Sequence, residues 1–160
     1  MTVQRTLVIF RHAKSAWPEG VPDDQRPLGP RGRRNAPAAG RWLRDEVDRI
    51  DLAVCSPAVR ARQTWELAGV ELDPQPRVVE DERVYAASAD ALLGVVQDLP
   101  DGVGTAVLVG HNPGLADLVE LLTGELCELK TASVAVLTWS GSWLDAAPRV
   151  AALAGHNTAR

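Results

Sequence analysis

Short apolar runs alternate along the chain with segments that repeat apolar residues every three or four positions. The runs at residues 6–10, 52–55 and 105–109 are typical of buried strands. The repeating segments are typical of helices that bury one face. These helices are expected to start near Pro30, Pro57, Ser88 and Pro113. Strands and helices in alternation predict an α/β protein with a largely parallel sheet.

The last third of the chain predicts a different kind of strand. Residues 131–139 read as a strand, and Ser140-Gly141-Ser142 looks like a turn that leads into Trp143-Leu144. A hairpin is therefore expected there. Residues 155–160 are predicted to be a flexible tail. Since 160 residues is the usual length of one domain, residues 1–154 are expected to form a single domain.

Composition narrows the possible functions. The chain has 17 Lys and Arg against 21 Asp and Glu, which gives a formal net charge of −4 and a pI near 5.4. This balance argues against a general nucleic-acid binder. No apolar run approaches the length of a membrane span, and nothing resembles a signal peptide. We therefore expect a cytoplasmic protein that binds neither nucleic acid nor membrane.

Two histidines occupy matching places relative to two of the predicted strands. His12 lies two residues beyond the first strong strand, and His111 lies two residues beyond the third. If these strands are parallel, both imidazoles lie at the carboxyl edge of the sheet, where ligand sites form. Arg11 precedes His12, and Arg60 lies in the first turn of the next helix. Guanidinium groups and helix N-termini bind anions, so the four side chains predict a phosphoryl site.

The chain has no sequence motif for a metal or a nucleotide. There is no H-E-x-x-H segment, no Cys/His cluster and no P-loop lysine motif, and the only lysines are Lys14 and Lys130. We therefore expect no metal and no cofactor. A histidine nucleophile suits such a site: neutral imidazole attacks phosphorus, and water then hydrolyses the phosphohistidine. Unperturbed imidazole has a pKa of about 6.5 and is largely neutral at pH 7.

Three segments resemble the signatures of the histidine phosphatase superfamily, which has the phosphoglycerate mutase-like fold. They are Leu7-Val8-Ile9-Phe10-Arg11-His12-Ala13-Lys14-Ser15, Ser56-Pro57-Ala58-Val59-Arg60-Ala61-Arg62-Gln63-Thr64 and Val109-Gly110-His111-Asn112-Pro113. The Arg26-Pro27-Leu28-Gly29 segment looks like the SixA-type phosphohistidine phosphatase branch. The resemblance implies a three-layer α/β/α sandwich, with a mostly parallel central sheet and helices on both faces.

The same resemblance implies roles for individual residues. His12 corresponds to the nucleophile, and Arg11, Arg60 and His111 correspond to the groups that bind and stabilise the phosphoryl oxygens. Ser15 is a further candidate for phosphate binding, and the equally favoured alternative is that it is an ordinary loop residue without a role in binding. The implied activity is a metal-independent phosphatase that forms a phosphohistidine on His12.

The proton donor to the leaving group is less defined. Glu82 is the leading candidate because Glu82-Arg83-Val84-Tyr85 looks like the E-R-x-Y segment of the mutases. Asp81 and Glu80 are alternatives, and all three could instead be solvated loop acids. An alkoxide needs a proton to leave, whereas a protonated imidazole leaves readily, so a phosphohistidine substrate tolerates a poorly placed acid.

Three functions stay open at this point. The first is a phosphatase that acts on phosphohistidine in a protein, such as a phosphorelay domain. The second keeps the chemistry and acts on a small sugar or nucleotide phosphate ester. The third is a non-catalytic phosphate-binding or interaction module. The substrate or partner is thus a phosphorylated protein or a small phosphate ester.

Overall fold

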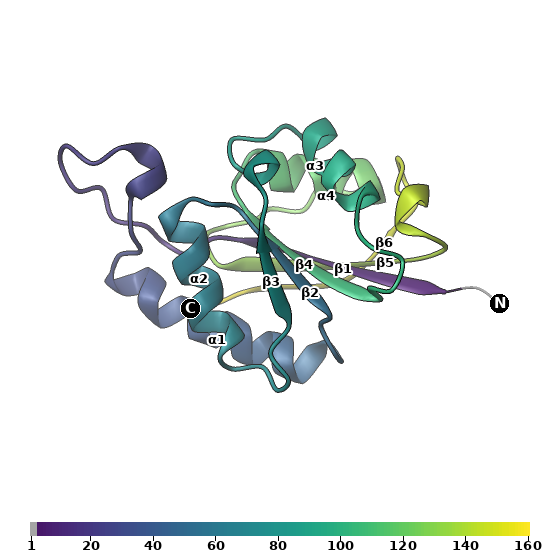
Figure 1. Ribbon diagram of the computed structural model, residues 1–160, viewed down its shortest axis with the longest axis horizontal. Coiled ribbons are helices and arrows are strands. Elements are labelled where there is room, and N and C mark those ends of the chain that lie inside the picture. The colour runs from purple at the N-terminus through teal and green to yellow at the C-terminus, as the bar shows by residue number, and fades with distance from the viewer. Residues whose placement is uncertain (1–2) are drawn as a thin grey trace.

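The structure is a computed structural model that describes residues 3–160, which form one six-stranded sheet between two pairs of helices (Figure 1). The strands are β1 Gln4–Arg11, β2 Leu52–Cys55, β3 Arg77–Glu80, β4 Thr105–Gly110, β5 Ser133–Ser140 and β6 Ala152–Thr158. The helices are α1 Pro30–Glu46, α2 Val59–Gly69, α3 Ala89–Gln97 and α4 Gly114–Thr123. The predicted α/β fold with helices on both faces of the sheet is confirmed.

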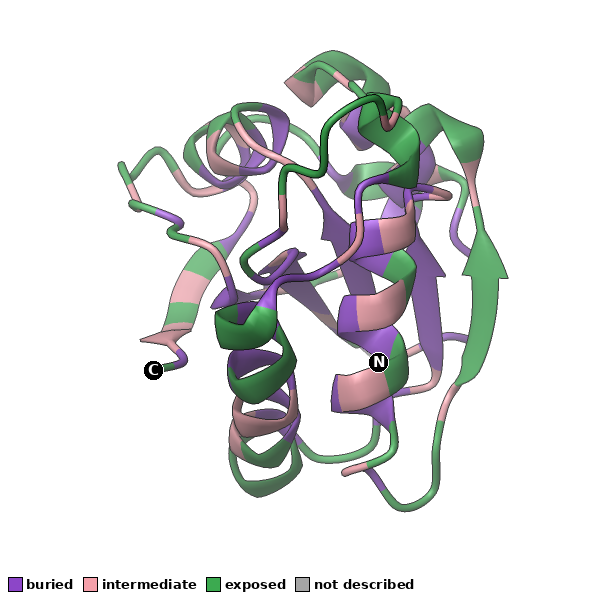
Figure 2. Cartoon of the chain, turned by 90° about the vertical axis from the view of Figure 1, so that its left-hand side faces the viewer, coloured by how far each residue is buried: buried purple, intermediate pink, exposed green. Residues whose placement is uncertain are grey.

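The strand order β3-β2-β4-β1-β5-β6 places the parallel strands β1 and β4 side by side in the middle of the sheet. Their register pairs Arg11, the last residue of β1, with Gly110, the last residue of β4. The residues that follow, His12 and His111, are therefore brought to the same point of the carboxyl edge. Figure 2 looks onto this edge of the sheet.

The hydrophobic core lies on both faces of the sheet because the central strands are buried on both sides. In β1, Leu7 and Ile9 belong to the core that α3 and α4 cover. Val8 and Phe10 alternate with them and belong to the core that α1 and α2 cover. The continuous apolar runs in the sequence correspond to these doubly covered strands.

Two glycines set how closely helix α1 approaches its neighbours. A Cβ on Gly40 would lie 2.2 Å from the backbone oxygen of Ala68 in α2. A Cβ on Gly32 would lie 2.1 Å from the backbone oxygen of Lys14, two residues after His12. Both distances are far below contact distance, so the absence of a side chain lets α1 press against α2 and against the chain that leaves β1.

The C-terminal predictions are wrong in two places. Residues 155–158 are not a tail, because they pair with β5 as the antiparallel edge strand β6. The predicted hairpin into Trp143 does not form either, since Trp143 begins a short 3-10 helix, Trp143–Asp145. The Trp143 indole is fully buried, and its Nε1 donates to the backbone oxygen of Val103 at 2.8 Å. Burial of this large side chain turns the chain into the core before β6 begins.

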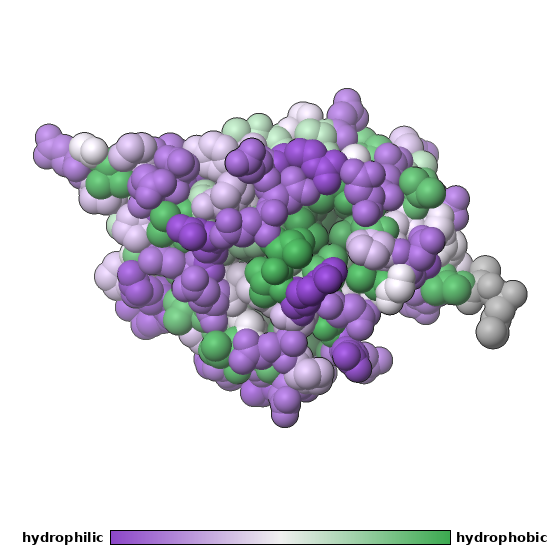
Figure 3. All heavy atoms as spheres, viewed as in Figure 1, coloured by the Kyte–Doolittle hydropathy of each residue, from purple (hydrophilic) through white to green (hydrophobic). Residues whose placement is uncertain are grey.

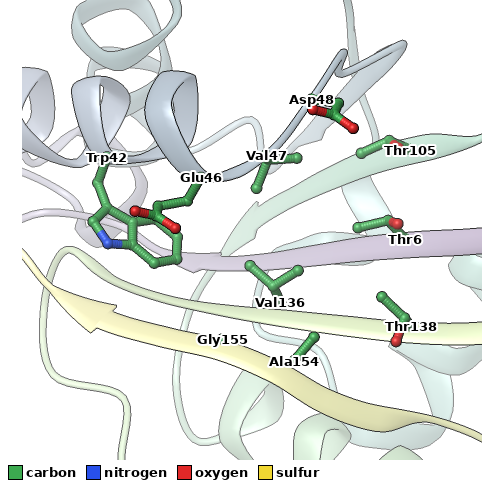
Figure 4. A pocket seen from close by; sticks show the side chains of 10 residues that line it. All are labelled: Thr6, Trp42, Glu46, Val47, Asp48, Thr105, Val136, Thr138, Ala154 and Gly155. Carbon is green, nitrogen blue, oxygen red and sulfur yellow. The ribbon is translucent and has the colours of Figure 1, made fainter.

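A cavity of about 270 Å³ lies between α1 and the sheet, near the amino ends of the parallel strands (Figure 4). Trp42 and Glu46 of α1 line one side, and Thr6, Thr105 and Thr138 of three adjacent strands line the other. The cavity contains none of the predicted site residues. Within residues 3–160, no helix has the length and apolarity needed to cross a membrane.

Candidate active site

The two predicted histidines meet at the carboxyl edge of the sheet. The centroids of the His12 and His111 rings are 5.1 Å apart, and the rings are tilted by 54°. The backbone N–H of His12 donates to the Gly110 oxygen at 3.0 Å, which continues the β1–β4 pairing one residue past the strand. The backbone thus fixes the spacing of the two imidazoles.

The backbone also defines which nitrogen of His12 is free. Its Nδ1 lies 2.8 Å from the Ala13 backbone oxygen, which only accepts hydrogen bonds, so Nδ1 carries the hydrogen. In the neutral ring, Nε2 then holds the lone pair. Burial, with smaller contributions from the neighbouring His111, Arg60 and Arg11, lowers the pKa of His12 to about 3. The ring is therefore neutral at pH 7 and has the form of a nucleophile.

His111 is oriented by a hydroxyl that sequence reasoning did not single out. Its Nε2 lies 2.8 Å from Ser56 Oγ, and Ser56 Oγ also accepts from the backbone N–H of Ala58 at 3.2 Å. The Tyr85 ring packs edge-on against His111 with centroids 5.5 Å apart. Burial lowers the pKa of His111 to about 4, and the nearby Arg60 contributes. The Nδ1 atom is buried and has no hydrogen-bond partner within residues 3–160.

The two arginines bring guanidinium groups to the same edge. Arg11 Nη1 donates to the Leu129 backbone oxygen at 3.0 Å, while its Nε is buried without a partner among the described residues. Desolvation lowers the pKa of Arg11. The Arg60 side chain is 8% exposed and comes from the first turn of α2. Both arginines act electrostatically on His12 and on His111, so the four side chains predicted for the site lie near one another.

Arg60 is held by a residue that the sequence did not identify, Asp23. Asp23 lies in the β1–α1 loop, residues 12–29, within a short 3-10 helix, Asp23–Gln25. Arg60 Nη1 donates to the Asp23 backbone oxygen at 2.7 Å, and Nη2 donates to Oδ2 at 3.1 Å. The Tyr85 hydroxyl donates to the same Oδ2. The Asp23 side chain is 52% exposed, so it lies at the mouth of the site.

The structure gives Ser15 a partner within the protein. Its hydroxyl accepts from Arg26 Nη2, and the side chain is buried. Arg26 Nη1 in turn donates to Asp23 Oδ1 at 3.0 Å, and the guanidinium lies over the Trp17 ring. Ser15 thus supports the loop through Arg26, and phosphate binding by its hydroxyl stays a prediction.

The three acids considered as proton donors differ in their partners. Glu80 pairs with Arg62 at 3.7 Å. Asp81 accepts from Arg83 at 2.8 Å, and this bond holds the pKa of Asp81 below its ordinary value. Glu82 is exposed and has no ion-pair partner within residues 3–160. The geometry therefore leaves Glu82 as the unengaged acid of the three.

Helix α2 also supports the loop that follows His12. The Thr64 hydroxyl accepts from the backbone N–H of Ala13 at 2.9 Å and donates to the Arg60 backbone oxygen at 2.7 Å. Thr64 is fully buried. Because Ala13 holds Nδ1 of His12, this hydroxyl connects the arginine helix to the orientation of the imidazole.

The arrangement can bind a tetrahedral anion next to a neutral imidazole. Buried arginines bind phosphoryl oxygens well because their donors form a rigid fork. Sequence reasoning missed Asp23, Ser56, Thr64 and Tyr85. Tyr85 ends the Glu82–Tyr85 segment, and Ser56 and Thr64 are the first and last residues of the second signature segment, whereas Asp23 lies in no segment that the sequence analysis quoted.

A family comparison agrees with this geometry. Residues 7–85 match the family described as the histidine phosphatase superfamily (branch 1). This range includes His12 and Arg60, while His111 lies beyond it.

Individual relatives cover more of the chain. This chain is 38% identical to an uncharacterized protein of Mycobacterium tuberculosis, over 94% of this chain and 100% of that protein. It is 30% identical to the phosphohistidine phosphatase SixA of Escherichia coli over 78% of this chain and 76% of that protein. A structure described as a phosphohistidine phosphatase SixA from Nakamurella multipartitia superposes with a TM-score of 0.89 and 32% identity. That match covers 98% of this chain and 96% of the other.

Proposed function

The chain belongs to the histidine phosphatase superfamily, and from that premise we propose that it hydrolyses phosphohistidine in a protein through a phosphohistidine intermediate on His12. The observation that carries the proposal is the pair of imidazoles 5.1 Å apart, with the charges of Arg11 and Arg60 acting on both rings. The similar SixA proteins bear the name of this activity. The proposed substrate is a phosphorylated protein of the cytoplasm.

The first step is attack by His12. Its Nε2 lone pair forms a bond to phosphorus, and the bond between phosphorus and the leaving group breaks with its electron pair going to that group. The Nδ1 hydrogen stays bonded to the Ala13 oxygen, so the phosphorylated ring carries a positive charge. Water then attacks phosphorus, the bond to Nε2 breaks, and orthophosphate leaves. No metal is required for either step.

Charge on the phosphoryl oxygens is stabilised by Arg11, Arg60 and His111 in this scheme. Ser56 Oγ accepts from the Ala58 N–H, and in this scheme its hydroxyl hydrogen donates to His111 Nε2. That assignment makes Nδ1 of His111 the N–H of the neutral ring. The Nδ1 of His111 and the Nε of Arg11 are then two buried N–H donors without a partner among the described residues, and a phosphoryl oxygen would accept from both.

Glu82 is the proposed proton donor when the leaving group is an alkoxide. It is the one acid of its segment that is not committed to an arginine among the described residues. A phosphohistidine leaves as neutral imidazole and has less need of this acid. Glu82→Gln is therefore expected to slow ester hydrolysis more than phosphohistidine hydrolysis.

The test compares substrates with and without chelator. The protein is expected to release phosphate from a phosphohistidine-bearing phosphotransfer domain in the presence of EDTA, and His12→Ala is expected to abolish release. Full activity of His12→Ala would contradict the proposal. A panel of sugar and nucleotide phosphates serves as the comparison, because a much higher kcat/KM on one of these esters would favour a small-ester phosphatase.

Binding experiments address the non-catalytic alternative. Vanadate or phosphate should bind with loss of affinity in Arg60→Ala. If the oxyanion binds but no phosphorylated substrate is turned over, the chain is a binding module and the enzymatic proposal fails.

A further inference from the structure

Asp23 occupies an unusual position for a carboxylate in a site that binds an anion. It accepts hydrogen bonds from Arg60, Arg26 and Tyr85, and its side chain is half exposed. Figure 1 shows the β1–α1 loop projecting beyond the carboxyl edge, and Figure 3 shows this projection as a mostly hydrophilic part of the surface. The loop thus brings a negative charge to the entrance of the phosphoryl site.

The contacts leave Arg60 able to bind substrate at the same time. A guanidinium has five N–H donors, and Asp23 accepts from two of the nitrogens, once through its backbone oxygen and once through Oδ2. The remaining N–H groups have no hydrogen-bond partner among the described residues and can donate to phosphoryl oxygens. Asp23 therefore does not have to be displaced when an anion binds.

Burial indicates which part of a substrate meets Asp23. His12 is 8% exposed and lies at the floor of the site, whereas the Asp23 side chain is 52% exposed. Displacement at phosphorus places the attacking and leaving atoms roughly in line. With the nucleophile at the floor, the leaving group points toward solvent. The exposed Asp23 side chain is on the solvent side of buried His12, the side toward which the leaving group departs.

Asp23 is ionised at neutral pH. The hydrogen bond from Tyr85, followed by those from Arg26 and Arg60, holds the pKa of Asp23 well below its usual range. An ionised carboxylate accepts hydrogen bonds and has no proton to give, so Asp23 cannot act as a general acid.

We propose that Asp23 is a specificity-determining residue, whose carboxylate accepts the ring N–H of a leaving imidazole and thereby favours phosphohistidine over phosphate esters. The inference rests on the proposed function and names the feature of the substrate that the site reads. A simple phosphate ester such as phenyl phosphate has no ring N–H in its leaving group, and an anionic leaving group is repelled by the carboxylate.

The step balances without a separate acid. The substrate ring carries phosphorus on one nitrogen and hydrogen on the other. Nε2 of His12 forms its bond to phosphorus while the substrate's P–N bond breaks, and that electron pair stays on the substrate ring. The ring leaves as neutral imidazole and keeps its N–H, which is bonded to Asp23. Because the carboxylate stabilises the protonated form of the substrate ring, it keeps the better leaving group populated.

The experiment measures a ratio of specificity constants. N-phosphoimidazole and phenyl phosphate have ring leaving groups of similar size and differ in the N–H. For Asp23→Asn, kcat/KM on N-phosphoimidazole divided by kcat/KM on phenyl phosphate is expected to fall roughly 10- to 100-fold, the range for loss of a charge-assisted hydrogen bond. Because both substrates use Arg60, any displacement of that arginine cancels in the ratio.

Two further variants make the result specific. Asp24→Asn removes a neighbouring exposed charge that has no ion-pair partner among the described residues, and it should keep the wild-type ratio. Asp23→Glu keeps the carboxylate and should retain more of the ratio than Asp23→Asn. An unchanged ratio in Asp23→Asn, with both rates reduced equally, would overturn the inference and leave Asp23 as a support for Arg60.

The outcome also separates this inference from the proposed function. If the wild-type protein cleaves phenyl phosphate but neither N-phosphoimidazole nor a phosphohistidine protein, the proposed function fails and this inference fails with it. If the wild type cleaves N-phosphoimidazole and Asp23→Asn leaves the ratio intact, only the inference is overturned.

Discussion

Thr64 connects helix α2 to the loop that carries the proposed nucleophile, and Thr64→Val tests this connection with almost no change in volume. The substitution removes the acceptor of the Ala13 N–H, which lies 2.9 Å from Thr64 Oγ1. Loss of a partner for a buried donor costs about 1–3 kcal/mol. A methyl carbon also prefers a separation of about 3.5 Å or more, so Ala13 has to move by roughly 0.6 Å.

Both stability and turnover should respond. At about 2–4 °C per kcal/mol for a chain of this size, a loss near 2 kcal/mol lowers the unfolding midpoint by about 4–8 °C. Ala13 holds Nδ1 of His12, so its displacement misaligns the imidazole. Small displacements of a nucleophile are costly, and we expect kcat to fall roughly tenfold or more. Calorimetry and steady-state hydrolysis of phenyl phosphate measure the two effects.

Matched variants isolate the hydrogen bond. Thr138→Val makes the same chemical change in the cavity at the amino end of the strands, where the hydroxyl has no hydrogen bond to another side chain within residues 3–160. Thr64→Ser keeps the oxygen and should restore most of the activity. If Thr64→Val matches Thr138→Val in both midpoint and kcat, the proposed connection between α2 and His12 is refuted.

Three other predictions follow from the same structure. Gly32→Ala places a Cβ 2.1 Å from the Lys14 backbone oxygen and should lower the free energy of unfolding, measured by urea titration, by about 1–3 kcal/mol. Gly94→Ala meets open space and should not lower it, and equal effects of the two variants would contradict the close approach of α1 to Lys14. Between pH 6.5 and about 3, the unfolded chain binds a proton at His12 that the folded protein does not, so the free energy of unfolding should fall as the pH falls. His12→Gln should make this pH dependence less steep, and an unaltered slope would contradict the burial of His12 as a neutral ring. Burial raises the pKa of Cys55 to about 12, so iodoacetamide should label Cys55 only after unfolding. Rapid labelling of Cys55 in the folded protein would contradict its burial.

The positions of the two histidines could be predicted because they depend on a few strong local signals. The apolar runs identify the strands, and each imidazole follows its strand by the same two residues. Parallel pairing of β1 with β4 then converts equal spacing along the chain into proximity in space. Arg60 could be placed for a similar reason, since it lies at the start of a helix that leaves the same edge.

Contacts made by loops were beyond this reasoning. Asp23 and Arg60 are 37 positions apart, and their pairing depends on the path of an irregular loop that no periodic pattern describes. Ser56 stood next to the expected helix start at Pro57, and its contact with His111 follows from the side-by-side placement of β2 and β4. Strand β6 was missed because Gly155, His156 and Asn157 have little strand propensity, and pairing with β5 overrides that preference.

The central claim is that phosphorus is transferred to Nε2 of His12. Rapid mixing of the protein with labelled N-phosphoimidazole, followed by an alkaline quench and peptide mapping, tests this transfer directly. We expect an alkali-stable and acid-labile label on the peptide that contains His12, and no label in His12→Ala. A label on another residue, or wild-type turnover by His12→Ala without any labelled peptide, would contradict it.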